Sequence, residues 1–564
     1  MSKADKKVGY KDFAKGLYFI PLGGSEQFGV NFNLYCCDGK WLIMDCGIGF
    51  ADETFPNVDI LLPDPEFIEP VREDIVGMVI THAHEDHVGA VPYLWPRLKC
   101  PIYCSKFTAA VLRAKFHDFP NCKDAVIYEV DTEQDLKLEP FSLKFVHVAH
   151  SIPQAVLTRI KTPYGNLVHT GDWNLDPAPV IDTPTDEATL KHIGDEGVLA
   201  YIGDSTNAPI PGRAGSETEV EEGLLKVFQG LEGKRILITM FASNVARIQT
   251  ICRTAQATGR SVCMLGRSLH RMTANAHECG YLDELQGFVS EGDIDSIPGG
   301  QLVIIATGSQ GEARAALARI ARGDWKGVKL GRGDVAIFSS KAIPGNEKDI
   351  NKVKNNLSAS GVRVIDASNA GARIHVSGHP YRDEIRDMYG FLRPQCVIPV
   401  HGEHVMLVAQ AGLAHECGIK QVIIPNNGSV IRLDGEPEMI DHVPTGVLAV
   451  EPQRVIKGDH AAIHERRKLQ YSGAAVITVV LDRQGRLKQD PHITLMGLID
   501  HNDEGELDLL GDLQQEIEET LLDLAEDGVT DDIRIEEDLR VACRRYLDHV
   551  FGFKPKVCIH LLRF

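Results

Sequence analysis

The segment Thr81-His82-Ala83-His84-Glu85-Asp86-His87 places three imidazoles and two carboxylates within seven consecutive positions. Imidazole nitrogens and carboxylate oxygens are the donors that Zn²⁺ and Mn²⁺ accept, so this density predicts a metal site. In an extended segment His82 and His84 point to the same side and can share one ion. Asp86 and His87 fall past the next turn and can face a second ion. The alternative interpretation is a solvated loop that is rich in histidine.

The flanking segments must hold these ligands in place. Residues 75–80 form an apolar run that is typical of a buried strand, and residues 88–94 have the pattern of a short helix. The ligands are therefore expected at the carboxyl end of a strand, supported by a sheet. A solvated loop has no reason to follow a buried strand, which favours the metal interpretation.

Other strands also end in side chains that bind metals. Asp45 follows strand 41–44, His150 follows an alternating strand that begins at residue 145, and Asp172 follows strand 167–171. We expect His150 to complete the first ion's ligands, Asp172 to bridge both ions and His401, after strand 396–400, to serve the second. Taken alone, a strand-end carboxylate before glycine is a turn former, and a strand-end histidine is ordinarily structural.

The length predicts several domains, because 564 residues exceed what one hydrophobic core supports. We expect a metal domain over 1–212 that resumes over 365–449, and between them a layer of alternating strands and helices over 213–364. A linker over 450–472 and a small α+β domain over 473–564 follow. No Walker sequence or well-placed G-x-G-x-x-G motif accompanies the middle layer, so a nucleotide cofactor is not expected.

The net charge of −20 is concentrated in one segment. Residues 500–538 contain seventeen acidic residues against the single basic Arg534, which leaves a charge of −4 for the rest of the chain. A nearly neutral body that carries two divalent cations is compatible with an RNA substrate. Within the acidic segment, residues 506–527 alternate Leu and Ile with Asp and Glu, which predicts amphipathic packing with one solvated face.

Three features indicate a cytoplasmic protein. No run of eighteen apolar residues exists, so no membrane span is expected. The charged start, residues 1–7, is not followed by an apolar segment with a cleavage site, which argues against export. Thirteen cysteines without a C-x-x-C pair favour reduced thiols over a disulfide framework.

The motif at residues 81–87 resembles the signature of the metallo-β-lactamase superfamily. The whole chain resembles the β-CASP branch of that superfamily and, within it, the bacterial ribonuclease J family. The segments that carry this likeness are 81–87, 203–207, 241–244, 307–312, 343–347, 375–379 and 399–403. The resemblance implies an αββα metallo-β-lactamase sandwich with an inserted βα (β-CASP) domain and a small α+β C-terminal domain. The acidic tail is the part that matches least.

The resemblance also implies a reaction, namely hydrolysis of RNA phosphodiester bonds from the 5′ end and internally, in RNA processing and decay. Two divalent ions, Zn²⁺ or alternatively Mn²⁺, would activate a hydroxide that attacks phosphorus. Carried over by position, the first ion takes His82, His84 and His150, the second takes Asp86, His87 and His401, and Asp172 lies between them. The family's counterpart of Asp45 hydrogen-bonds a motif histidine.

Two further groups of residues match by position. His379, with Asp204 orienting its ring, is the implied proton donor to the leaving 3′-oxygen, although a packed structural histidine is the plainer alternative. Ser243, His375, Ser377 and the backbone at Gly378 match a pocket for the terminal 5′-phosphate, and Arg267 would add the charge that favours a monophosphate. Alone, Ser243 would be an ordinary helix N-cap.

Other functions are compatible with the motif alone. A lactone or thioester hydrolase needs neither a long cleft nor a 150-residue insert, and a silent scaffold should lack at least one ligand. A related nuclease acting on DNA is harder to separate, because contacts to the 2′-hydroxyl cannot be read from sequence. The family likeness implies RNA, preferably with a 5′-monophosphate, a homodimer or homotetramer, and RNA-decay or ribosome-associated partners.

Overall fold

The computed structural model describes residues 9–564 except 286, 344 and 501. The charged start at residues 1–7, and Pro344 in the segment 343–347, therefore lie outside the described residues. The chain divides into two compact units, one of Met1–Gly49 and Leu62–Gly446, the other of Phe50–Leu61 and Val447–Phe564. We call these the larger and the smaller unit. None of the helices described is both long and apolar enough to span a membrane.

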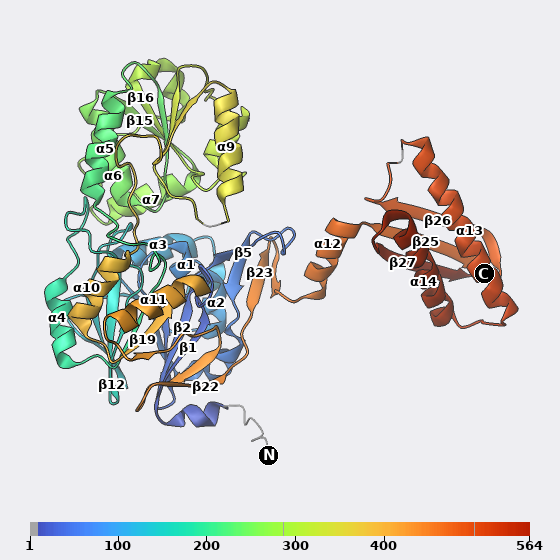
Figure 1. Cartoon of the computed structure of the whole chain (residues 1–564), viewed down its shortest axis with the longest axis horizontal. Helices are drawn as coiled ribbons and strands as arrows, with labels where there is room; N and C mark the ends of the chain where they lie inside the picture. The colour runs from blue at the N-terminus through green and yellow to red at the C-terminus, as the bar shows by residue number, and fades with distance from the viewer. Residues whose placement is uncertain (1–8, 286, 344, 501) are drawn as a thin grey trace. The chain divides into compact units, whose positions relative to one another are not determined.

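Two mixed sheets form the base of the larger unit (Figure 1). The first has the strand order β22-β21-β1-β2-β3-β6-β7-β8. Its strands are β1 (Leu17–Gly23), β2 (Phe32–Cys37), β3 (Lys40–Met44), β6 (Ile75–Ile80), β7 (Ile102–Cys104), β8 (Ile127–Glu129), β21 (Ser429–Arg432) and β22 (Glu438–His442). The second has the order β20-β19-β13-β12-β11-β10-β9. Its strands are β9 (Leu136–Leu138), β10 (Phe141–His147), β11 (Val156–Thr162), β12 (Gly165–His169), β13 (Ala200–Asp204), β19 (Cys396–Val400) and β20 (Gln421–Val422).

The two sheets pack face to face. Leu17, Phe19 and Leu42 of the first sheet share one buried apolar cluster with Ile160 and Ile202 of the second. The opposite face of the second sheet is covered by α4 (Glu187–Glu196), α10 (Arg382–Leu392) and α11 (His404–Glu416), whose buried residues form another cluster with its strands. The first sheet is flanked by α1 (Glu85–Val88), α2 (Val91–Leu98) and α3 (Lys106–Phe116). This is the predicted αββα sandwich.

A parallel sheet with helices on both faces is inserted into this sandwich. Its order is β15-β16-β14-β17-β18, with β14 (Ile236–Thr239), β15 (Ser261–Leu265), β16 (Leu302–Ala306), β17 (Val335–Phe338) and β18 (Arg363–Ile365). One face packs against α5 (Glu217–Gln229), α6 (Val245–Ala257) and α7 (Arg267–Glu278), the other against α8 (Ala316–Arg322) and α9 (Glu347–Ala359). Figure 1 shows α5 and α6 on one side and α9 on the other. Burial on both faces explains why these strands read as continuous apolar runs.

The insert and the metal motif share one apolar cluster. Ala83, between His82 and His84, is 2% exposed and belongs to the same cluster as Val220 of α5 and Ile248 of α6. Ile152, two residues after His150, belongs to it as well. The insert therefore contributes to holding the loops that carry the predicted ligands.

The smaller unit contains a three-stranded sheet, β26-β25-β27, with two helices on one face. Its elements are β25 (Ala474–Leu481), β26 (Leu487–Met496), α13 (Glu504–Glu526), α14 (Asp532–Phe551) and β27 (Lys556–Arg563). Leu513, Ile517 and Leu521 of α13 are buried against the sheet, and acidic residues such as Glu518 and Glu519 lie exposed. The acidic helices are thus amphipathic packing elements, as predicted, because their apolar residues recur at helical spacing.

The segment predicted as a linker, 450–472, carries regular structure. It contains the end of β23 (Val447–Glu451), β24 (Arg454–Lys457) and α12 (Ala461–Ser472). These strands belong to a sheet of order β24-β23-β5-β4, with β4 (Gly49–Phe50) and β5 (Ile60–Pro63). Ile463 of α12 is buried with Val58 and Ala449, so residues from 51–61 and from 447–463 form a small core of their own. The sequence prediction missed this core because its halves are about 400 residues apart.

Candidate metal centre

The predicted ligands follow strands whose carboxyl ends lie at the same edge of their sheets. In the first sheet, β3 and β6 are parallel, with Met44 opposite Val79. Asp45 and the motif at 81–87 therefore follow the carboxyl ends of two adjacent strands. In the second, β12, β13 and β19 are parallel, with His169 opposite Ile202 and Asp204 opposite Val400. Packing the two sheets face to face brings both groups of strand ends into one site.

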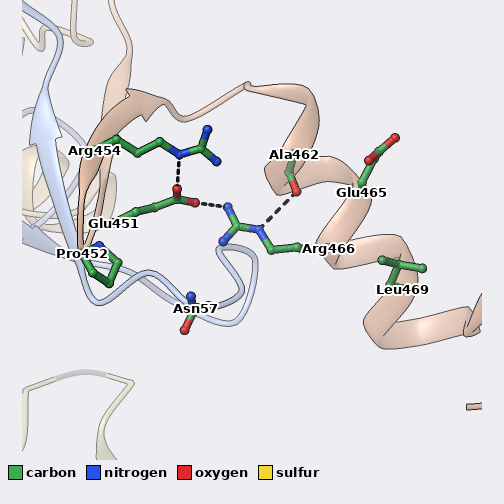
Figure 2. A pocket seen from close by; sticks show the side chains of 8 residues that line it. All are labelled: Asn57, Glu451, Pro452, Arg454, Ala462, Glu465, Arg466 and Leu469. Carbon is green, nitrogen blue, oxygen red and sulfur yellow. Dashed lines mark hydrogen bonds and ion pairs between the residues drawn. The ribbon is translucent and has the colours of Figure 1, made fainter. Parts of the chain in front are cut away.

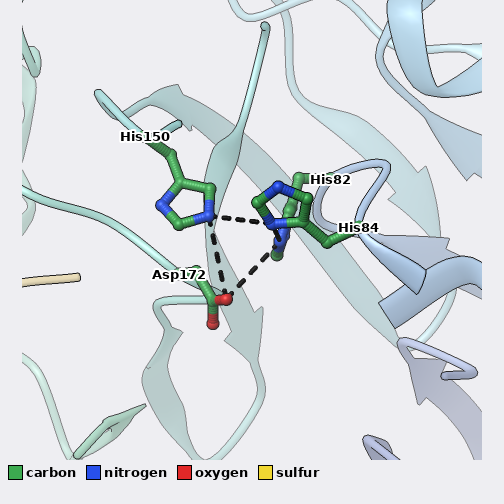
Figure 3. Close-up of side chains that lie close together, drawn as sticks. All are labelled: His82, His84, His150 and Asp172. Atoms are coloured by element: carbon green, nitrogen blue, oxygen red, sulfur yellow. Dashed lines mark hydrogen bonds and ion pairs between the residues drawn. The ribbon is translucent and has the colours of Figure 1, made fainter. Parts of the chain in front are cut away.

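Three histidines and one aspartate form the first set of ligands. His84 Nδ1 lies 3.1 Å from His82 Nε2 and 3.0 Å from His150 Nε2. Asp172 Oδ2 lies 3.5 Å from His82 Nε2 and 3.9 Å from His150 Nε2. Figure 3 shows the four side chains pointing toward a common centre. The four ligand atoms lie within 4.8 Å of one another, a spacing at which a single cation can contact all of them.

The second set is built from Asp86, His87, His401 and the same Asp172. His87 Nε2 lies 3.2 Å from Asp172 Oδ2 and 3.6 Å from Asp86 Oδ2. His401 Nε2 lies 3.5 Å from Asp172 Oδ1 and 3.7 Å from Asp86 Oδ2. The two sets therefore meet at the carboxylate of Asp172, as the sequence analysis expected. All seven predicted ligands converge.

The opposite ring nitrogens of these histidines are occupied by hydrogen bonds. His87 Nδ1 donates to Asp45 Oδ2 at 2.7 Å, and His150 Nδ1 donates to the carbonyl oxygen of Gly378 at 2.7 Å. His401 Nδ1 donates to Asn31 Oδ1 at 3.1 Å. Thr81 Oγ1 donates to Asp45 and lies 3.0 Å from His82 Nδ1, whose proton it accepts. Because Nδ1 holds the proton in each of these four rings, the lone pair of Nε2 faces the centre, whereas His84 presents its Nδ1 to the centre.

This donor set fits divalent cations. Lone pairs of neutral imidazoles face each other at about 3 Å, and burial lowers the pKa of His82 and His150 well below the usual value and that of His84 to about 4. The Oδ1 atom of Asp172 is buried and accepts no hydrogen bond within the described residues. A cation would satisfy both features at once, because a buried charge needs a partner. Nitrogen and carboxylate donors suit Zn²⁺ and Mn²⁺.

His379 and Asp204 form an acid pair at the edge of this centre. His379 Nδ1 donates to Asp204 Oδ2 at 2.8 Å, and the same carboxylate accepts a hydrogen bond from the backbone N–H of Thr206 at 2.8 Å. Burial opposes the charged ring, but the carboxylates of Asp204 and Asp172 raise the pKa of His379 to about 9. These carboxylates therefore favour the protonated form of His379, whose ring lies beside the ligands.

The residues of the predicted phosphate pocket come from three segments. Ser377 accepts hydrogen bonds from Asn207 Nδ2 at 2.9 Å and from the backbone N–H of His379 at 3.2 Å, and Gly378 holds His150. His375 lies 3.4 Å from Arg247 of α6, the helix that Ser243 precedes. Arg267 begins α7, and among the described residues no hydrogen bond or ion pair joins it to the other four.

Four residues at the site were missed by the sequence analysis. Asn31 and Thr81 orient ligand histidines, and both are buried. The fully buried Arg247 bonds Glu217, Ser339 and His375. Lys341 is exposed and close enough to His375 to lower the pKa of its imidazole, an effect smaller than those of burial and of Arg247. Nothing in the residue types marks Asn31 or Arg247, whereas a lysine shortly after strand β17 could have been singled out.

A separate pocket in the smaller unit contains no predicted site residue. It lies beside α12 and is lined by Asn57, Glu451, Pro452, Arg454, Ala462, Glu465, Arg466 and Leu469 (Figure 2). Arg454 and Arg466 both bond the carboxylate of Glu451. The positive charge in this pocket is therefore already balanced within the chain.

Four family models match the chain. The metallo-beta-lactamase superfamily matches residues 26–207, and the beta-CASP domain of ribonuclease J matches residues 233–357. The RNA specificity domain of Zn-dependent metallo-hydrolases matches residues 371–425, and the ribonuclease J C-terminal domain matches residues 461–564. The tail, which the sequence analysis found the least similar part, therefore has a match of its own.

Similar proteins cover nearly the whole chain. Ribonuclease J of Sinorhizobium meliloti is 39% identical over 561 residues, which are 97% of this chain and 97% of that protein. Ribonuclease J of Mycolicibacterium smegmatis is 37% identical over 96% of each chain. A crystal structure of a protein of unknown function from Enterococcus faecalis V583 covers 74% of this chain and 100% of its own, with a TM-score of 0.52 and 14% identity, and shows the fold alone. On the extent and the identity of the first match, the chain belongs to the ribonuclease J family.

Proposed function

We propose that this chain is a metal-dependent ribonuclease that hydrolyses RNA phosphodiester bonds, from the 5′ end and internally. One observation carries the proposal: seven nitrogen and oxygen ligands converge in two sets that share Asp172. Family membership supports RNA as the substrate, since the similar proteins are named ribonuclease J and an RNA specificity domain matches residues 371–425.

In this proposal His82, His84 and His150 hold one divalent cation, and Asp86, His87 and His401 hold the other. Asp172 would serve both cations, and we propose Zn²⁺ ahead of Mn²⁺. Bound there, the cations would supply the positive charge that lowers the pKa of an attacking water and offsets the charge developing on the phosphate. Asp45, Thr81, Asn31 and the carbonyl of Gly378 fix the ring orientations.

The chain itself would supply the proton for the leaving group. In this proposal His379, whose Nδ1 is bonded to Asp204, would carry the transferable proton on its other nitrogen, and its ring lies 5.3 Å from that of His150, measured between centroids. A leaving 3′-alkoxide is a poor leaving group without a proton, so a donor at this place accelerates cleavage. Asp204 keeps the ring aligned through its 2.8 Å hydrogen bond.

We propose that the terminal 5′-phosphate binds to Ser243, His375, Ser377 and the backbone at Gly378. Arg267 would add the positive charge that favours a monophosphate. Lys341 joins this proposal because its cation lies close enough to His375 to affect the pKa of that imidazole. Hydroxyl groups, a neutral imidazole and a cation are the groups that bind a phosphate. A 5′-monophosphate would fit this set better than a bulkier triphosphate.

The domain boundaries, the cellular compartment, the oligomeric state and the partners are also proposals. Residues 1–212 and 365–449 would form the metal domain, 213–364 the β-CASP domain and 473–564 the C-terminal domain. Thirteen free thiols support a reducing compartment, the cytoplasm. A homodimer or homotetramer, and partners in RNA decay or at the ribosome, follow from the family likeness.

The test uses the full chain stripped of metal with a chelator and reloaded with Zn²⁺ or Mn²⁺. RNA labelled at the 5′ or the 3′ end is incubated with each form, and the products are mapped by length. We expect mononucleotides from the 5′ end together with internal cuts, and only after metal is restored. Full activity in the stripped protein would reject the metal assignment, and faster cleavage of single-stranded DNA of the same sequence would reject RNA as the substrate.

A further inference from the structure

A fully buried glutamine lies behind the acid pair. Gln410 is on α11, nine residues after His401, and its side chain is 0% exposed. Its Nε2 donates to the backbone carbonyl oxygen of Asp204 at 3.0 Å. Its Oε1 lies 2.8 Å from Ser205 Oγ, whose single proton is shared between this oxygen and the carbonyl oxygen of Val400, 2.6 Å away. Both ends of the amide are therefore bonded to the two residues at the end of β13.

The backbone of Asp204 is held on the N-terminal side of its Cα as well. The backbone N–H of Asp204 donates to Thr170 Oγ1 at 3.1 Å. Thr170 precedes the segment that delivers Asp172, whereas Gln410 lies on the helix that follows His401. Side chains from two ligand-bearing segments thus hold the two peptide groups that flank the Cα of Asp204, and the carboxylate carried by that Cα accepts the hydrogen bond from His379.

We propose that Gln410 is a positioning residue for the proton donor: it fixes the Asp204 peptide so that the carboxylate aligns the ring of His379. This inference rests on the proposed function, in which His379 protonates the leaving 3′-oxygen. Gln410 touches neither His379 nor the metal ligands through a hydrogen bond of its side chain, so it acts through Asp204. In this proposal Gln410 affects only how His379 is aimed when it donates its proton. Metal binding should therefore not depend on Gln410.

The physical reason is the cost of leaving the carbonyl of Asp204 unpaired. A buried carbonyl that loses its donor is driven toward another partner, and the peptide rotates to find one. Rotation of this peptide moves the Asp204 carboxylate, and with it the nitrogen of His379 that carries the proton. A displacement of about 1 Å in a reacting group costs roughly a hundredfold in rate.

The test is a double-mutant cycle on 5′-monophosphorylated RNA, with Gln410→Met, His379→Ala and the double variant. Methionine keeps the volume of glutamine but neither hydrogen bond. We expect Gln410→Met to lower kcat roughly ten- to a hundredfold with KM unchanged, and His379→Ala to lower it roughly a hundred- to ten-thousandfold. The double variant should be within about twofold of His379→Ala, because Gln410 acts through that histidine.

Two controls separate positioning from a loss of folding. Leu413→Met changes another buried residue of α11 and should leave kcat within about twofold of the parent. Ser205→Ala removes the hydroxyl that lies between Oε1 and the carbonyl oxygen of Val400 but keeps the bond from Nε2 to Asp204, and should give a smaller loss of the same kind. Metal content and the thermal midpoint are measured for every variant, and Gln410→Met should keep the full metal content.

The inference is overturned if Gln410→Met retains the parent kcat, or if its effect multiplies with that of His379→Ala in the double variant. A loss of metal in Gln410→Met would also overturn it, since the effect would then be on the ligands. Failure of the proposed function looks different: His379→Ala itself would keep the parent rate, whatever Gln410→Met does.

Discussion

His150 Nδ1 donates to the carbonyl oxygen of Gly378 at 2.7 Å, across 228 residues of sequence. The segment around Gly378 also carries Ser377 and His379, which we assign to the phosphate pocket and to proton donation. One short segment therefore orients a predicted ligand of the first cation and supplies groups for the substrate. A Cβ on Gly378 would meet the imidazole of His150 at 2.8 Å, so only glycine allows this approach.

The first prediction concerns the first set of ligands. Replacing His84 by alanine removes the one nitrogen that lies near both His82 and His150. We expect less than one equivalent of the first metal to remain bound and RNA cleavage to fall by at least about a thousandfold. Elemental analysis and a cleavage assay check both. His464→Ala, an exposed histidine of α12, is the matched control and should leave both values unchanged.

The second prediction separates the two cations. Asn31 accepts the Nδ1 proton of His401, so Asn31→Leu frees that ring to rotate. We expect the affinity for the second cation to weaken roughly ten- to a hundredfold, as for other groups that orient metal ligands, while the first cation stays bound. Titration against a competing chelating dye measures the two steps. Equal weakening of both steps would contradict the assignment of His401 to the second cation.

The third prediction tests proton donation by His379. Sulfur in place of the bridging 3′-oxygen gives a thiolate leaving group, which departs without a proton. We expect His379→Ala to cleave ordinary RNA roughly a hundredfold or more slowly, and to recover most of the parent rate on the sulfur-bridged linkage. Single-turnover kinetics on the two substrates measure the ratio. The same loss on both substrates would show that His379 has another role.

The fourth prediction concerns the end of the RNA. Lys341 is exposed beside His375, and Lys341→Met removes its positive charge without shortening the side chain much. We expect KM for 5′-monophosphorylated RNA to rise roughly tenfold, as befits the loss of a charged hydrogen bond, with little change for RNA that begins with a 5′-hydroxyl. Lys348→Met, an exposed lysine of α9, serves as the control. An equal change on both RNAs would instead indicate general attraction of the phosphate backbone.

The fifth prediction concerns stability. The buried carboxylate of Glu384 accepts the backbone N–H groups of Leu175, Ala214 and Tyr381, and so pins the segments after Asp172 and His379. Glu384→Ala removes the partner of three backbone donors, one in a buried and two in part-buried hydrogen bonds, and should destabilise the larger unit by about 3 kcal/mol. Thermal unfolding should show a lower midpoint. Glu416→Ala, which removes an exposed partner of Arg382, should change it little.

The strands of the metal domain follow from local sequence, and so does most of its predicted site. The expected strand 75–80 is β6, and the strand expected at 396–400 has the same limits in the structure. His150 and Asp172 were expected at strand tips but lie three residues beyond β10 and β12, because the loops must reach across the edge of the sheet. The helix expected over 88–94 is instead two helices: α1 ends at Val88, and α2 begins at Val91.

The sequence alone determined which side chains can bind a cation and in which order the strands present them. A histidine or aspartate at a strand end can be recognised from the sequence, because a strand and its end are marked by a local pattern of residues. Only the tertiary structure decided that Asn31 would hold His401, Gly378 would hold His150 and Gln410 would hold the Asp204 peptide. These contacts join ordinary residues that are about 200 to 400 positions apart, and their partners are set by how sheets and helices pack, which no local pattern contains.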